Sequence, residues 1–261
     1  MTSIKSSISP KAKIHKSVKI GPYCIIGDDV VIKKNCELKS HVSITGNTEI
    51  GEENTFYPFC SIGSDPQDLK FRNEQNKLII GNKNTFRENV TVNPGTTGGG
   101  LKTIIKNNCL FMVGSHIAHD CIIDSNVILA NNATLAGHVE IGENAIVGGN
   151  SAVHQFVKIG KYSMIGGMSG IEKNLLPYCL YIGIRTGIKG LNLIGLKRKN
   201  ISNQKIKLMS AFLKEIFKVN SSIENQITKI DKKYIQITEI NEIIKFIKKS
   251  NKRGIANFSN D

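Results

Sequence analysis

The sequence of 261 residues lacks three features that mark common protein classes. Its first residues, MTSIKSSISP, hold no apolar segment of the kind found in secretory signals. No apolar run approaches the roughly 20 residues that span a bilayer. The six cysteines include no CxxC pair, which disfavours a redox motif or a thiolate zinc site. A soluble, cytoplasmic protein without integral membrane association is therefore expected.

The pattern that is present is an apolar residue at every sixth position. A period of six fits neither a 3.6-residue helix nor the two-residue alternation of a simple strand. It fits a parallel β-helix, in which three hexapeptides close one triangular coil of about 18 residues. We call these positions ladder residues: Ile14, Ile20, Ile26, Ile32, Leu38, Ile44, Ile50, Phe56, Ile62, Ile80, Phe86, Val92, Ile105, Phe111, Ile117, Ile123, Leu129, Leu135, Ile141, Val147, Val153, Ile159, Ile165 and Ile171.

Small residues recur four places after the ladder residue, where a second inward-facing side chain is expected. Five of the six cysteines stand there, so they are expected to be reduced core residues: Cys24, Cys36, Cys60, Cys109 and Cys121. Glycine often follows the ladder residue directly, and we expect it to supply the unusual backbone angles of the corners.

Two interruptions and a change of period divide the chain. Residues 64–77 and 93–102 are too polar or glycine-rich to continue a coil, so both are expected to project as loops. We call them the first loop and the glycine loop. After residue 191 a helical period replaces the six-residue one, with Ser202 as a candidate N-cap. The expected organisation is a β-helix over 1–191 and a helical domain over 192–261.

The net charge of +14 is concentrated at the C-terminal end. Residues 197–261 hold 15 lysines and arginines against 6 acidic residues. Such a basic module favours an acidic partner, whether nucleic acid, anionic lipid or protein, although a solvated lysine-rich surface explains it equally. The sequence holds no nucleic-acid-binding motif, so no nucleic acid partner is expected.

Four of the six histidines are predicted to gather on one edge of the solenoid. Steps of 18 residues lead from His119 to Gly137 and then to Gln155, so these three should stack at about 4.8 Å per coil. His138 and His154 are neighbours of the second and third members, and His116 precedes the first. A step of 18 residues back from His119 leads to Leu101, in the glycine loop.

Three explanations fit this cluster. It is a solvated polar ladder, a zinc site between subunits, or a general base supported by a carboxylate. The spacing of His116 and His119 differs from the wider histidine pair of the gamma-class carbonic anhydrases, and no further ligand supplements it. Asp120 directly follows His119, and a carboxylate holding one ring nitrogen raises the basicity of the other.

Four strings carry a resemblance to a known family. HIAHDC (116–121), LANNATLAGHV (129–139), AVHQF (152–156) and GLKRK (195–199) closely resemble the UDP-N-acetylglucosamine O-acyltransferases, which perform the first step of lipid A (lipopolysaccharide) biosynthesis. The resemblance covers essentially the whole chain. It implies a mainly β fold, a left-handed parallel β-helix followed by a small C-terminal α-helical domain, assembled as a homotrimer.

The resemblance also implies roles for individual residues. His119 would take the proton from the sugar 3-hydroxyl, Asp120 would orient His119, and the N–H of Gly137 would stabilise the oxyanion. The donor would be a 3-hydroxyacyl thioester on the 4'-phosphopantetheine of acyl carrier protein, so no other cofactor and no metal are expected. The implied contacts to the UDP-sugar are Asp68, Lys70, His116, His138, His154, Gln155, Asn192, Arg198 and Lys199.

Departures from the family pattern leave some specificity open. Asn93 stands where the family usually has histidine, Ile194 where it commonly has an acidic residue, and Lys199 where it has a second arginine. A 3-amino analogue of the sugar therefore stays open as the acceptor. Gly167 matches the position that limits acyl length, and glycine there predicts a longer 3-hydroxyacyl chain.

Alternatives from other classes remain at this point. An N-acyltransferase or a coenzyme A-dependent acetyltransferase would use the same scaffold. A metal-dependent trimeric hydratase or a non-catalytic scaffold would also fit hexapeptide repeats.

Overall fold

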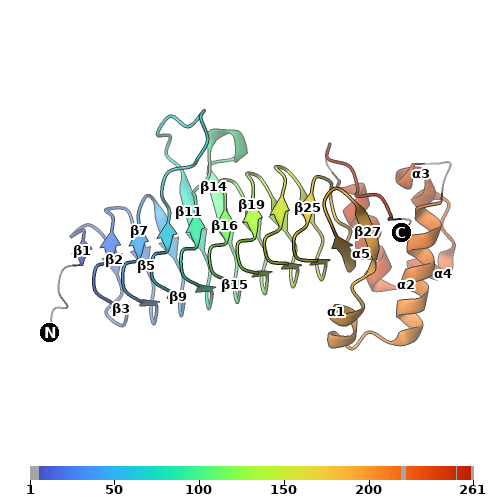
Figure 1. The fold of residues 1–261 in the computed structure, drawn as a ribbon, viewed down its shortest axis with the longest axis horizontal. Coiled ribbons are helices and arrows are strands. Elements are labelled where there is room, and N and C mark those ends of the chain that lie inside the picture. Colours follow the sequence, from blue (N-terminus) through green and yellow to red (C-terminus); the bar gives the residue numbers. More distant parts are fainter. Residues whose placement is uncertain (1–5, 219–221, 251, 260–261) are drawn as a thin grey trace.

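The fold is a long triangular coil of short parallel strands with helices at its C-terminal end (Figure 1). The computed structural model describes residues 6–218, 222–250 and 252–259. Within these residues, each coil contributes one strand to each of three sheets. Partners in successive coils are 18 residues apart, as in Ile117 and Leu135, except across the two loops and in the last coil, where Ile165 pairs with Tyr181. The six-residue period therefore predicted the architecture correctly.

The strands group by face of the triangle. The first sheet holds β1 (Ser7–Ile8), β4 (Ile25–Ile26), β7 (Ser43–Ile44), β10 (Ser61–Ile62), β13 (Thr91–Val92), β16 (His116–Ile117), β19 (Thr134–Leu135), β22 (Ala152–Val153) and β25 (Gly170–Ile171). The second holds β2 (Lys13–Ile14), β5 (Val31–Ile32), β8 (Thr48–Ile50), β11 (Lys77–Ile80), β14 (Lys102–Ile105), β17 (Ile122–Ile123), β20 (Glu140–Ile141) and β23 (Lys158–Ile159). The third holds β3 (Lys19–Ile20), β6 (Glu37–Leu38), β9 (Thr55–Phe56), β12 (Thr85–Phe86), β15 (Leu110–Phe111), β18 (Ile128–Leu129), β21 (Ile146–Val147), β24 (Met164–Ile165), β26 (Cys179–Ile182) and β27 (Gly187–Leu191).

The ladder residues form one continuous core. From Ile26 to Ile171 every one of them is buried, each contributing roughly 1.5–3 kcal/mol. Ile14 and Ile20 are only partly buried because few coils lie beneath them. Phe56, Phe86 and Phe111 stack inside the third sheet with ring centroids 4.7 and 4.8 Å apart. All six cysteines are free and buried, as predicted for the five in the repeat.

The predicted role of glycine at the corners holds at Gly63, whose φ is 80°, but was wrong for the other glycines that directly follow a ladder residue. The left-handed backbone conformation falls three places after the ladder residue, and the commonest residue there is asparagine, as at Asn126, Asn132 and Asn144, because asparagine tolerates it. At most positions directly after a ladder residue, glycine allows close approach of the next coil instead. At Gly81, which has no positive φ, a β-carbon would lie 2.6 Å from the carbonyl oxygen of Lys106.

Both loops leave the solenoid at the same corner, between the first and second sheets. The first loop joins β10 to β11, and the glycine loop joins β13 to β14 and contains the short 3-10 helix Thr97–Gly99. Figure 1 shows them projecting together from one side of the solenoid. The same corner in the next two coils carries Asp120 and His138, both with positive φ. The topology thus brings two loops and two histidine-bearing corners together.

Five helices close the described chain. They are α1 (Leu193–Arg198), α2 (Asn203–Ile216), α3 (Ile223–Thr228), α4 (Lys232–Ile235) and α5 (Thr238–Lys248). Ser202 caps α2 as predicted, and the apolar face of α2 is buried. The helical period did not reveal α1 or α4, which are too short to show one. No helix in the described ranges is long and apolar enough to cross a membrane.

The chain returns to the solenoid after α5. β27 runs antiparallel to β26 at the end of the third sheet. The C-terminal segment then forms bridges from Ile255 to Asn174 and from Phe258 to Ile188. The helices are therefore joined to the end of the solenoid both before α1, through β27, and after α5, through the C-terminal segment.

Candidate active site

The centre of the site is a buried pair of neighbouring side chains, His119 and Asp120. Nδ1 of His119 lies 2.8 Å from Oδ2 of Asp120. His119 is 7% exposed and Asp120 5% exposed, so solvent competes little for this bond. The bond occupies Nδ1 and leaves Nε2 as the ring nitrogen that can accept a proton. This is the arrangement of a general base oriented by a carboxylate.

The Asp120 carboxylate is held by the glycine loop as well as by His119. The backbone N–H of Thr96 donates to both of its oxygens at 2.9 and 3.0 Å, and Oγ1 of Thr96 donates to Oδ2 at 2.6 Å. The backbone N–H of Asp120 donates to Oγ1 of Thr103 at 2.8 Å. Burial alone would raise the pKa of this carboxyl, but the hydrogen bonds from His119 and Thr96 outweigh it, and the pKa is lowered. Asp120 is therefore ionised at neutral pH.

The predicted stack above His119 is present. The N–H of His138 donates to the carbonyl of His119, which places Gly137 over the imidazole in the next coil. A β-carbon at Gly137 would lie 2.5 Å from Cε1 and 2.6 Å from Nε2 of His119. Among the described residues, no acceptor binds the N–H of Gly137. The glycine thus supplies both room for the ring and a backbone donor without a protein partner.

Two further histidines border this pair. The ring of His138 meets that of His119 edge-on at 5.0 Å and stacks on Phe156 at 4.3 Å. Nδ1 of His116 lies 2.7 Å from Oγ1 of Thr91, one coil before it. Burial lowers the pKa of both His116 and His138, which favours their neutral, hydrogen-bonding forms.

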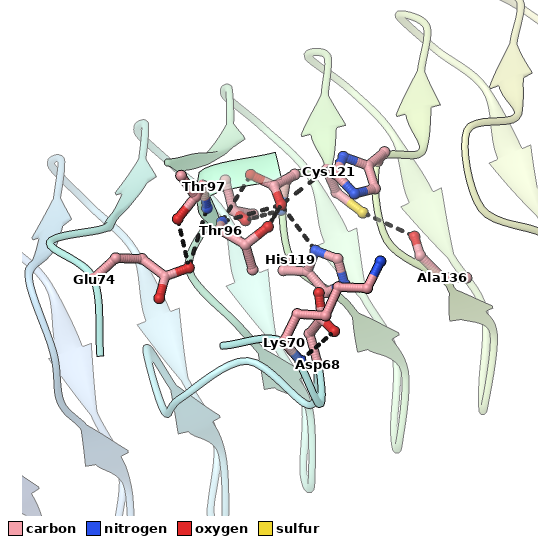
Figure 2. A network of polar contacts seen from close by, with 11 residues as sticks. Asp68, Lys70, Glu74, Thr96, Thr97, His119, Cys121 and Ala136 are labelled. Atoms are coloured by element: carbon pink, nitrogen blue, oxygen red, sulfur yellow. Dashed lines mark hydrogen bonds and ion pairs between the residues drawn. The ribbon is translucent and has the colours of Figure 1, made fainter. Parts of the chain in front are cut away.

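The remaining predicted residues of this edge are more exposed. His154 and Gln155 lie on the next coil and are exposed. Asp68 and Lys70 lie on the first loop, where Asp68 accepts a hydrogen bond from the backbone of Lys70 at 3.0 Å. Burial lowers the pKa of His138, and the charge of Asp68 acts in the opposite direction. Because a surface charge acts only over a short distance, the first loop lies close to the histidines. Figure 2 shows the first loop and His119 in one view.

Asn93, where the family usually has histidine, joins the start of the glycine loop to the start of the first loop. Its Nδ2 donates to the carbonyls of Ser64 and Asp65 at 2.9 and 3.0 Å. Its Oδ1 is buried without a hydrogen-bond partner among the described residues. The departure therefore has a structural use at the start of the first loop.

The C-terminal residues of the predicted site lie on or beside α1, several coils beyond His119 in the same chain (Figure 1). Asn192 caps α1 through Gly195 and donates to the carbonyl of Tyr162 at 2.9 Å. The ammonium of Lys199 lies 4.2 Å from the centre of the Tyr162 ring, whereas Arg198 is exposed. One chain alone does not bring these three residues to His119.

Four residues of the site were missed from the sequence: Glu74, Thr96, Gly99 and Thr103. Thr103 had a signal, since it is a polar residue at an inward-facing place of the repeat and is fully buried. The other three lie on loops whose path the six-residue period does not set. His119, Asp120 and His138 also have ligand atoms within 4.8 Å of one another, which is the one cluster in the described residues with metal-ligating geometry.

Comparisons with known proteins agree with this geometry. A family model described as Udp N-acetylglucosamine O-acyltransferase, domain 2, matches residues 175–256, and a hexapeptide transferase model matches 11–46, 102–137 and 138–173. The acyl-[acyl-carrier-protein]–UDP-N-acetylglucosamine O-acyltransferase of Thermodesulfovibrio yellowstonii is 48% identical over 95% of this chain and 96% of its own. The chain belongs to the UDP-N-acetylglucosamine O-acyltransferase family.

Solved structures support the same assignment and add the hand of the solenoid. A crystal structure of a UDP-N-acetylglucosamine acyltransferase matches with a TM-score of 0.93 and 40% identity, covering 99% of this chain and 100% of that one. The Francisella novicida enzyme matches with a TM-score of 0.92 and 34% identity, covering 98% and 95%. The fold of this family member is a left-handed parallel β-helix with C-terminal helices, as the resemblance implied.

Proposed function

We propose that this chain carries out the reaction of its family. It transfers a 3-hydroxyacyl group from acyl carrier protein to the 3-hydroxyl of UDP-N-acetylglucosamine, the first step of lipid A biosynthesis. The observation that carries the proposal is the bond between Nδ1 of His119 and a buried, ionised Asp120, with Gly137 stacked over the ring. A general base, an orienting carboxylate and a backbone donor are the groups that acyl transfer requires.

The reaction proceeds by direct attack on the thioester. Nε2 of His119 takes the proton of the sugar 3-hydroxyl while the oxygen bonds to the thioester carbonyl carbon. The N–H of Gly137 stabilises the resulting oxyanion. Collapse of the tetrahedral intermediate breaks the carbon–sulfur bond, and the phosphopantetheine thiolate receives the proton from His119. Because the thioester is already activated, neither a covalent acyl-enzyme nor a resident metal or other cofactor takes part.

The proposed assembly is a cytoplasmic homotrimer with active sites between neighbouring subunits. Its support is the placement of the predicted contacts. One set of predicted contacts lies around or near His119: Asp68, Lys70, His116, His138, His154 and Gln155. A second set lies several coils away: Asn192, Arg198 and Lys199. A site between subunits would let one chain contribute the first set and its neighbour the second.

The decisive experiment is mass spectrometry of the product formed from a mixed pool of donors and acceptors. The pool contains 3-hydroxyacyl carrier proteins of several lengths, acetyl-coenzyme A, UDP-N-acetylglucosamine and its 3-amino analogue. Appearance of a 3-O-(3-hydroxyacyl) UDP-sugar supports the proposal. A product from acetyl-coenzyme A alone, or acylation of the amine alone, would replace it with one of the rival transferases.

A metal analysis of the purified protein addresses the hydratase alternative. His119, Asp120 and His138 have metal-ligating spacing, but Oδ2 of Asp120 already accepts hydrogen bonds from Thr96 and His119. The proposal expects acyl transfer to persist after chelation. Loss of activity with chelator and its return with zinc would contradict the metal-free mechanism.

A further inference from the structure

The glycine loop contacts the Asp120 carboxylate through two different kinds of group. Thr96 supplies two donors, its N–H and its hydroxyl, to a side chain that has no exposed surface. Thr96 is itself only 4% exposed. The 2.6 Å bond from Oγ1 is short, as expected for a hydroxyl donating to an ionised acceptor.

Gly99 provides the second contact. A β-carbon on Gly99 would lie 2.1 Å from Cγ and 2.3 Å from Oδ1 of Asp120, so the loop backbone packs directly against the carboxylate. Gly98 differs sharply, because a β-carbon there would meet only Oγ1 of Thr96, at 3.9 Å. Adjacent glycines in the same loop therefore have opposite tolerance for a methyl group.

The first loop fixes the glycine loop from the outside. Oε1 of Glu74 accepts hydrogen bonds from the N–H and the hydroxyl of Thr97 at 3.1 and 2.9 Å, and Oε2 accepts one from the N–H of Arg72 at 2.8 Å. These bonds lower the pKa of Glu74 to about 2. Thr97 thus bonds to Glu74 while its neighbour Thr96 bonds to the Asp120 carboxylate, and Figure 2 shows Glu74, Thr96 and Thr97 side by side.

We propose that the glycine loop is a clamp that positions Asp120, with Thr96 as its donor and Gly99 as its contact surface. The inference rests on the proposed function, because it takes His119 to be the general base. A carboxylate fixed by Thr96 and Gly99 keeps its bond to Nδ1 of His119 in one orientation. That bond holds the imidazole in the tautomer whose Nε2 accepts a proton. Thr96 is thus a positioning residue that acts through Asp120.

The first test removes the hydroxyl of Thr96 and then restores it. Thr96→Val is expected to lower kcat by about 10-fold to 100-fold, with the KM for the UDP-sugar changed by less than about threefold. Thr96→Ser keeps both donors and is expected to recover kcat to within about threefold of the wild type. Thr85→Val is the matched control, since Thr85 faces outward on β12 away from the site.

The pH profile separates positioning from mere folding. The titratable groups near Asp120 are His119, His138 and Cys121, with His119 acting in turn on His116 and Asp68 on His138. Without the Thr96 hydroxyl the carboxylate is less stabilised and attracts protons more strongly. The acid limb of kcat/KM should therefore move to higher pH in Thr96→Val and stay in place in Thr85→Val. A structural defect would lower the amount of active enzyme and leave that limb unmoved.

The glycine pair repeats the test without removing a donor. Gly99→Ala is expected to lower kcat by about 10-fold or more, because its β-carbon displaces the carboxylate or the loop. Gly98→Ala, the same change one residue earlier, is expected to keep wild-type kcat. Both variants should remain folded, as judged by circular dichroism and subunit mass.

Two results would overturn the clamp. One is a Thr96→Val enzyme with wild-type kcat and an unmoved acid limb. The other is equal activity of Gly98→Ala and Gly99→Ala. Either result leaves the proposed function standing, because the wild-type enzyme still transfers acyl groups in the same assay. Failure of the wild type to acylate the UDP-sugar would instead remove the proposed function itself.

Discussion

The imidazole of His119 lies directly against the backbone of Gly137, closer than any β-carbon at 137 would allow. Gly137→Ala should therefore push the ring from its place and lower kcat by about 100-fold or more, as misplacement of a reacting group by about 1 Å does. Gly27→Ala is the matched control, because its β-carbon would lie no closer than 3.4 Å to the next coil. Steady-state kinetics on both variants checks this, and an unimpaired Gly137→Ala enzyme would contradict the stacking argument.

Removal of the proposed base is the most direct test of the mechanism. His119→Ala should lose on the order of 10²–10⁴-fold or more in kcat, since that is what a general base contributes. The protein should keep its fold, because the ladder residues and not His119 make the core. Circular dichroism and analytical ultracentrifugation provide the control. A fully active variant would refute the role.

The lowered pKa of Asp120 predicts how stability depends on pH. A carboxyl whose folded-state pKa is depressed contributes stability that is fully present above its unfolded pKa of about 3.9. That contribution is lost as the pH falls through the lower folded-state value. The difference in melting temperature between wild type and Asp120→Asn should thus be largest near neutral pH and shrink below about pH 4. A difference that grows on acidification would reverse the assignment.

Gly167 predicts the length of the acyl chain. A β-carbon there would meet only Gly149, no closer than 3.4 Å, so the corner is open. The wild-type enzyme should prefer a longer 3-hydroxyacyl donor, and Gly167→Met should shift the preference to shorter chains by filling that space. Competition between donors, read by mass spectrometry, measures both. A wild-type preference for ten-carbon donors would contradict the prediction.

The basic surface of α2 predicts how the acidic carrier protein is attracted. Lys205, Lys207 and Lys214 on α2 and Lys218 just after it are all exposed, and the ammonium of Lys205 lies 3.5 Å from the carboxylate of Glu239. The apparent affinity for acyl carrier protein should fall as salt rises, because charges on exposed surfaces are screened beyond about 10 Å at 0.1 M. Lys207→Glu with Lys214→Glu should raise the KM for the donor and leave kcat unchanged. Lys83→Glu, on the solenoid, serves as the control, and a salt-independent KM would remove the idea.

The sequence predicted the solenoid and the position of Gly137 over His119 because both follow from the repeat. A strict period fixes which residues face inward and which lie one coil apart, so His119, Gly137 and the core cysteines fell where they were expected. The contacts of Thr96, Gly99 and Glu74 did not follow, because a loop leaves the period and its path depends on tertiary contacts. The role of most glycines that directly follow a ladder residue was predicted wrongly for a similar reason. Close approach between coils is a property of stacking, which single hexapeptides do not reveal.

The covered end of the solenoid has a consequence for assembly. A stack of parallel strands exposes an unpaired edge on which a further chain could add. Here β27 occupies that edge of the third sheet, and the C-terminal segment bridges to Ile188 on it. Deleting the residues after α5 would uncover backbone donors and acceptors, and fibrous end-to-end association would then become the failure mode of an otherwise intact enzyme.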